Sequence, residues 1–222
     1  AETSQATSDI IIYAYIFIYY LVFSFIAFFF NTAIITSVQR RIEWKDNKLW
    51  DGLRDSIKHI KAIFIWSLIN AVVSTILNIL QNMFKEDSIV GRIIVGLIGW
   101  AWNILTFFSF PLMIINGVWP KDAIKESASL FKKTWWERAI IHVWVGFLFF
   151  LLYLVVLALS IFIIYIGFVI TWVVLIVLWM LFLIILSSTC NVIIKTILLS
   201  YAQNGKIPDG IENGESITDI AW

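Results

Sequence analysis

Cysteine, proline and charged residues are scarce in this sequence, and each scarcity excludes a class of protein. Cys190 is the only cysteine among 222 residues, which excludes an internal disulfide and a metal site built from cysteine thiolates. The three prolines and ten glycines form no linker, so we expect a single domain over residues 1–222. No Asp, Glu, Lys or Arg occurs between Arg138 and Lys195. A spanning helix needs about 20 apolar residues, so this uncharged run is long enough to cross a bilayer twice.

The residues that are present are mainly apolar. Hydrophobic residues make up 61% of the chain, against roughly 45–50% in soluble domains, and the mean hydropathy is +0.90. The net charge of +1 provides no field that would attract nucleic acid, and no nucleic-acid partner is expected. The composition and the long uncharged runs predict an all-α, multi-pass integral membrane protein surrounded by membrane lipids.

Five membrane spans are expected. Their approximate ranges are residues 10–38, 62–84, 89–118, 136–164 and 168–202. Pro111 is expected to kink the third span, and Gly167 marks a turn near residues 165–167 between the last two. Six spans are the alternative, because three shorter helices also fit the final apolar run, although they need a second turn inside uninterrupted apolar sequence.

Lysine and arginine gather in two of the connecting segments. Residues 40–61 and residues 121–138 are rich in both, whereas the connection between the second and third spans holds only Lys85 and Arg92. Basic connections usually face the cytoplasm. We therefore expect these two segments and the C-terminus to be cytoplasmic and the N-terminus to lie outside.

The two basic segments match each other in sequence. Residues 51–57 (Asp-Gly-Leu-Arg-Asp-Ser-Ile) correspond position by position to residues 122–128 (Asp-Ala-Ile-Lys-Glu-Ser-Ala). Each segment predicts an amphipathic helix, because apolar residues recur at helical spacing. The two apolar stripes are Leu53, Ile57, Ile60 and Phe64, and Ile124, Ala128, Phe131 and Trp135. Helices of this kind lie at the membrane interface, so a tandem repeat with two cytoplasmic interfacial helices is expected.

The expected repeats cover residues of about 10–84 and 89–164, and a final span with an acidic tail covers about 165–222. A fainter third copy follows the last span, where residues 208–211 (Pro-Asp-Gly-Ile) echo the start of both amphipathic segments. An asparagine precedes each copy at a similar interval: Asn31, Asn103 and Asn191. Coincidence in a biased composition is the alternative explanation for this third copy.

Few residues offer chemistry within the spans. Lys195 is the only charged residue expected to be buried in a span, which makes it a candidate site unless its ammonium reaches the headgroups. The candidate contacts to lipid headgroups are Lys195, Lys132, Lys133, Arg54 and Lys58. Ser187 to Cys190 are interpreted as helix-packing residues rather than as nucleophiles. His59 and His142 lack the neighbouring ligands of a metal site, so no metal, cofactor or catalytic residue is predicted.

Two functions are therefore considered first. One is a non-catalytic membrane subunit or scaffold that packs against other integral membrane subunits in a larger complex. The alternative is a lipid- or small-solute-handling protein in which the amphipathic helices form a basic cytoplasmic vestibule with Lys195, Lys132 and Lys133. An intramembrane enzyme is a third possibility, but acidic residues and nucleophile motifs are missing from the expected spans.

Several segments carry a family resemblance. They are residues 90–94 (Val-Gly-Arg-Ile-Ile), 102–108 (Trp-Asn-Ile-Leu-Thr-Phe-Phe), Pro111, 123–135 and 201–208. Together they resemble a family of multi-pass membrane proteins of unknown function, over nearly the whole chain. The repeated interfacial helix is also similar to those in the membrane domain associated with glycerophosphodiester phosphodiesterases. The catalytic phosphodiesterase domain has no counterpart here, so the resemblance implies the architecture and no activity.

Overall fold

The computed structural model describes residues 2–43, 45, 48–84, 89–133, 144–157 and 169–204. These residues form helices joined by short turns and include no strand, which confirms the all-α prediction. The helices are α1 (Glu2–Ile42), α2 (Leu49–Lys58), α3 (Ile60–Met83), α4 (Ile89–Leu105), α5 (Ser109–Asn116), α6 (Pro120–Lys133) and α8 (Val169–Asn204). A further apolar helix covers Trp144–Leu157.

Four helical stretches in the described residues are long and apolar enough to cross a membrane. They are Ile10–Ile42, Ile60–Met83, Ile89–Asn116 and Val173–Asn204. They correspond to the first, second, third and fifth expected spans. Of the expected fourth span the structure describes only Trp144–Leu157, and the expected turn at residues 165–167 lies outside the described residues. Because α8 is continuous over 36 residues, it contains no second turn of the kind that six spans would need.

The third span is broken between α4 and α5, a few residues before Pro111. Proline has no N–H to donate to the carbonyl of Phe107, and its ring crowds that carbonyl. Shorter bonds replace the helical ones there: Phe107 N donates to Ile104 O at 3.3 Å, and Ser109 N donates to Thr106 O at 3.1 Å. Regular helical bonding resumes after the break, where Leu112 N donates to the carbonyl of Phe108 at 2.9 Å.

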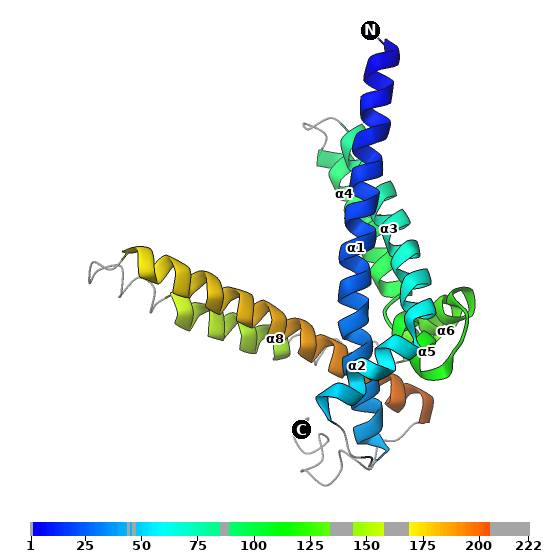
Figure 1. Ribbon diagram of the computed structural model, residues 1–222, viewed down its shortest axis with the longest axis vertical. Coiled ribbons are helices and arrows are strands. Elements are labelled where there is room, and N and C mark those ends of the chain that lie inside the picture. Colours follow the sequence, from blue (N-terminus) through cyan, green and yellow to red (C-terminus); the bar gives the residue numbers. More distant parts are fainter. Residues whose placement is uncertain are drawn as a thin grey trace.

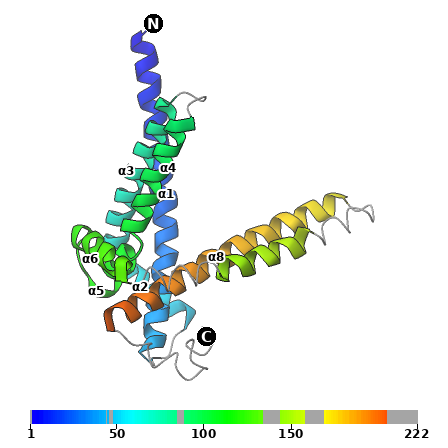
Figure 2. The same cartoon turned by 180° about the vertical axis from the view of Figure 1, so that it is seen from behind.

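The helices form a bundle with a diverging arm. Helices α1, α3 and α4 run beside one another, and α2, α5 and α6 gather toward the end where α1 finishes (Figure 1). The helix Trp144–Leu157 lies beside the first part of α8, and the two diverge from the bundle in both views (Figure 2). The last turns of α8 return to the core, where Leu198 and Leu199 are buried.

The short helix α5 lies at the centre of the core. All of its residues from Ser109 to Ile114 are buried. Phe110 packs against Phe28 of α1 and Trp66 of α3, with ring centroids 4.6 and 6.4 Å apart. Inside a bilayer such contacts stabilise by close packing rather than by removal of water, so this aromatic cluster holds the first three spans together.

Helix α2 packs on α1 through small and polar residues. Ser56 is buried, and its hydroxyl donates to the carbonyl of Phe29 at 3.0 Å. The Arg40 guanidinium donates to Asp55 Oδ2 at 2.7 Å, and Lys58 Nζ donates to Asp55 Oδ1 at 2.7 Å. Burial alone would raise the pKa of Asp55, but the hydrogen bonds from Lys58 and Arg40 outweigh it and hold that pKa below its ordinary value.

The apolar stripe of this segment faces away from the protein. Ile57, Ile60 and Phe64 are 60%, 44% and 49% exposed, and a turn at His59 divides the segment between α2 and α3. A polar face that packs inward and an apolar face that points outward are what an interfacial helix needs beside lipid.

Helix α6 makes a similar contact at the matched position. Ser127, which corresponds to Ser56 in the sequence match, is fully buried, and its Oγ accepts a hydrogen bond from Phe108 N at 2.9 Å. Ala123, which corresponds to Gly52, is also fully buried. In both segments, therefore, a small residue and a serine attach the amphipathic helix to the backbone of the preceding span.

The contact of α2 with α1 leads to a stability prediction. A Cβ added at Gly52 would lie 2.8 Å from the carbonyl oxygen of Ala33 and 2.6 Å from Ser37 Oγ. Because a backbone atom cannot move aside cheaply, Gly52→Ala should destabilise the protein by about 1–3 kcal/mol. Thermal unfolding in detergent, followed by tryptophan fluorescence, measures the change.

Gly96→Ala is the matched control, because a Cβ there meets nothing within 4 Å. Alanine is favoured over glycine inside a helix by about 0.5–1 kcal/mol, so this variant should keep or slightly raise the melting temperature. Equal melting temperatures for the two variants would contradict the close packing of α2 on α1.

Candidate functional site

Two cavities with shared walls lie where α1, α4, α5 and α8 meet. Their volumes are about 620 and 150 Å³. Residues that line both are Asn31, Asn103, Phe107, Val192 and Lys195. The larger one is also lined by aromatic and hydroxyl side chains, among them Trp100, Tyr153, Ser187 and Ser188. We call the two together the Lys195 cavity.

Asparagines from four helices line the Lys195 cavity: Asn31 of α1, Asn70 of α3, Asn103 of α4 and Asn191 of α8. Asn103 Nδ2 donates to Gly99 O at 3.0 Å, and Asn191 Nδ2 donates to Ser187 O at 2.9 Å. In both cases the acceptor lies four residues earlier on the same helix, so the amide is fixed in direction. Each amide retains a second N–H and an oxygen. Polar groups within apolar spans are costly, so several around one hollow indicate a site.

Lys195 enters the cavity beside the broken part of the third span. Its Nζ lies 4.6 Å from the centroid of the Phe107 ring, a favourable cation–π distance. The Phe107 ring in turn contacts Phe108 and Phe131, with centroids 4.7 and 6.2 Å away. Phe107 therefore has two roles at the break: its carbonyl cannot accept a bond from Pro111, and its ring contacts the lysine ammonium.

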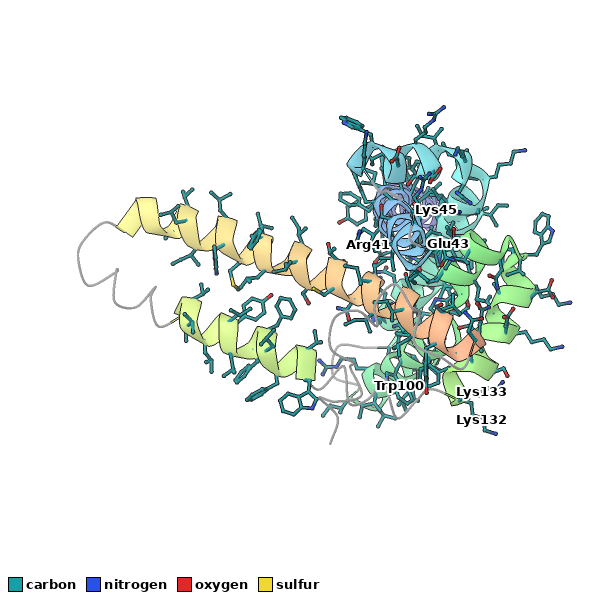
Figure 3. The ribbon with its side chains drawn as sticks, turned by 90° about the horizontal axis from the view of Figure 1, so that it is seen from below. Arg41, Glu43, Lys45, Trp100, Lys132 and Lys133 are labelled. Carbon is teal, nitrogen blue, oxygen red and sulfur yellow. The ribbon has the colours of Figure 1, made fainter. Side chains whose placement is uncertain are left out.

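The other predicted contact residues do not join Lys195. Arg54 and Lys58 are exposed on α2, where Lys58 pairs with Asp55. Lys132 and Lys133 are exposed at the end of α6, and Figure 3 shows them apart from the cavity residue Trp100. None of these four residues lines the Lys195 cavity, so Lys132 and Lys133 do not share this hollow with Lys195, and the contacts of all five residues to lipid headgroups stay a prediction.

Sequence reasoning missed the amides as site residues. Asn31, Asn103 and Asn191 were noted only for their similar spacing, and Asn70, which lines the smaller cavity and donates to Ser24 Oγ at 2.9 Å, was not noted. The signal that would have found them is an amide in the middle of an uncharged span. Their convergence on one cavity depends on how four helices cross, and no local sequence pattern shows this.

The donor set of the cavity suits an anion. An ammonium, amides and hydroxyls are hydrogen-bond donors, and a lysine supplies a compact positive charge. Within the described ranges no three His, Cys, Asp or Glu side chains come together as a metal would require. His59 lies at the junction of α2 and α3, with Nδ1 2.9 Å from Asp55 O, and His142 lies outside the described residues.

Residues 10–209 match a family of unknown function, DUF6159. The chain belongs to this family. No curated protein and no solved structure matches the chain. This match confirms the expected resemblance to a family of unknown function. The matched range, residues 10–209, includes every residue that lines the Lys195 cavity.

The structure predicts that the Lys195 cavity contains water. In a Cys190→Ala background, Ser187→Cys should react quickly with a charged, water-soluble thiol reagent, because Ser187 lines the cavity and thiols ionise only where water reaches them. Mass spectrometry of the intact protein measures the extent of labelling.

Leu186→Cys is the matched control, since Leu186 is 38% exposed, adjacent in sequence and outside the cavity walls. The thiol of Leu186→Cys should face lipid, where it does not ionise. Its labelling rate should therefore be lower than that of Ser187→Cys by a factor of about ten or more. A labelling rate for Ser187→Cys no higher than for Leu186→Cys would mean that the cavity is dry.

Proposed function

We propose that the Lys195 cavity binds an anionic group inside the membrane, which makes the chain a lipid- or small-solute-handling membrane protein. The observation that carries this proposal is the meeting of Lys195 with Asn31, Asn103 and Asn191 in one hollow. The ligand class is an oxyanion, either a phosphate-bearing lipid headgroup or a small free anion. The proposal assigns no catalysis to the cavity.

The size and chemistry of the cavity support this function. Ligand pockets commonly have volumes of about 300–1,000 Å³, and the larger hollow, at about 620 Å³, lies within that range. A lysine within an apolar span is uncommon and marks a candidate site for an ion or a ligand. The lining residues Trp100 and Tyr153 offer an apolar surface for the remainder of a lipid or solute.

A membrane subunit or scaffold is the second candidate function. It is supported by the arm, because large apolar side chains are exposed along α8 from Val173 to Leu186 and along Trp144–Leu157. Such an arm would pack between the spans of other integral membrane subunits. In this function the cavity would bind nothing, so ligand binding separates the two candidates.

We also propose an orientation in the membrane and a tandem repeat. The basic segments that contain α2 and α6 are proposed to face the cytoplasm, with the N-terminus outside and the C-terminus inside. Ser56 and Ser127, which correspond in the sequence match, each bond to the backbone of the preceding span, and this supports two copies of one structural unit. The likeness of these units to the membrane domain associated with glycerophosphodiester phosphodiesterases stays a prediction.

Ligand binding tests the proposal directly. The protein in neutral detergent is titrated with short-chain phosphatidylglycerol, with short-chain phosphatidylcholine, and with inorganic phosphate, and binding is followed by native mass spectrometry. Lys195→Gln should weaken binding of the anionic probe about tenfold or more, because it removes a charge-assisted hydrogen bond. Lys195→Arg should restore most of the affinity.

Lys133→Gln is the control, since Lys133 is exposed outside the cavity. Binding of phosphatidylglycerol alone would identify a lipid headgroup, and binding of phosphate would identify a small anion. Equal binding by Lys195→Gln and the unaltered protein, or a stable partner chain with no bound anion, would favour the scaffold instead.

A further inference from the structure

A second hollow with different chemistry lies between α1, α2 and α8. Its volume is about 940 Å³. Its walls are mostly aliphatic, with Phe30, Ile34 and Val38 from α1 and Ile185 and Ile193 from α8. Arg41 and Trp50 also line it. We call this hollow the Arg41 groove.

The Arg41 groove is separate from the Lys195 cavity. The two share no lining residue, and they use different faces of α8: Ile185, Thr189 and Ile193 line the groove, whereas Ser187 and Asn191 line the cavity. Seen from below, Arg41 and Trp100, one from each hollow, lie on opposite sides of α8 (Figure 3). The two hollows are therefore separate sites.

The groove is apolar along its length and basic at one end. Phe30 and Arg41 lie eleven positions apart on α1, so the walls follow α1 for about three turns and reach the cation near the helix end. Trp50, at the start of α2, is 79% exposed at that same end. Along the groove, apolar residues are followed by an arginine and a tryptophan. A membrane has the same order, because the hydrocarbon core is followed by the headgroup region, where Trp and Arg are common.

Arg41 differs from its neighbours in its ion pairs. Arg40 is held by Asp55 and Lys45 by Glu43. For Arg41, the described part of the chain provides no carboxylate within ion-pair distance. A guanidinium is well matched to two phosphate oxygens, so the groove offers its cation to an anion from outside the chain.

We propose that the Arg41 groove binds one phospholipid with an anionic headgroup, from the leaflet at the basic end of the bundle. One acyl chain lies between α1 and α8 against Ile34 and Ile193, and the phosphate is bound by Arg41 beside Trp50. The lipid fills the angle between the bundle and the start of the arm. This site does not depend on the ligand of the Lys195 cavity.

Lipid competition tests the proposal. The protein is exchanged into nanodiscs of equal parts phosphatidylcholine and phosphatidylglycerol, released in the mass spectrometer, and the retained lipids are counted. In a Lys195→Gln background, which removes the cation of the Lys195 cavity, one phosphatidylglycerol should be retained in preference to phosphatidylcholine. Arg41→Gln should lower this preference about fivefold, the effect of one basic residue at an anionic surface, and Arg41→Lys should lower it less.

Two further variants keep the result interpretable. Ile193→Trp, which keeps Arg41 and fills the groove, should also displace the lipid, whereas Lys45→Gln, which removes a cation outside the groove, should leave its retention unchanged. Retention that is unaffected by both Arg41→Gln and Ile193→Trp, equal retention of phosphatidylcholine, or a second copy of the chain in place of the lipid would each overturn the proposal.

Discussion

Pro111 removes one helical hydrogen bond from the third span, and its effects reach three parts of the molecule. In a bilayer a backbone group without a partner is costly, so the structure must supply new partners around the break. Ser127 of α6 accepts a hydrogen bond from the N–H of Phe108. The same bond docks the amphipathic helix, and the neighbouring Phe107 ring carries the ammonium of Lys195. The break therefore links α5, α6 and the Lys195 cavity.

Three buried hydroxyl side chains of the spans bond within their own helices. Thr32, Ser67 and Thr196 are fully buried, and each hydroxyl donates to a carbonyl four residues earlier, at 2.7–2.9 Å. Such bonds need no partner helix and leave no O–H donor for an anion. The amides of Asn103 and Asn191 make the same bond and still retain a donor and an acceptor beside the cavity. This difference separates structural polar residues from candidate binding residues.

The sequence predicted the membrane-spanning helices better than it predicted the contacts between them. Long uncharged runs are local signals, so the described spans lie close to the expected ranges, and Pro111 marked the third as irregular. The apolar stripe of residues 53–64 was also visible, but its outward direction follows from Gly52 and Ser56, whose small side chains let α2 approach α1 closely. Lys195 was recognised because a charge within a span is rare. No local pattern shows which asparagines lie beside Lys195, or that Lys132 and Lys133 lie apart from it, because both depend on how the helices cross.

The central claim is that Lys195 and the three asparagines bind an anion within the membrane. An experimental structure of the protein, purified with its native lipids, tests it most directly. The account predicts density for an oxyanion within hydrogen-bond distance of Lys195 Nζ and of at least one of the amides of Asn31, Asn103 and Asn191. A collapsed cavity, or a Lys195 side chain extended to the membrane surface with only apolar density behind it, would contradict the account.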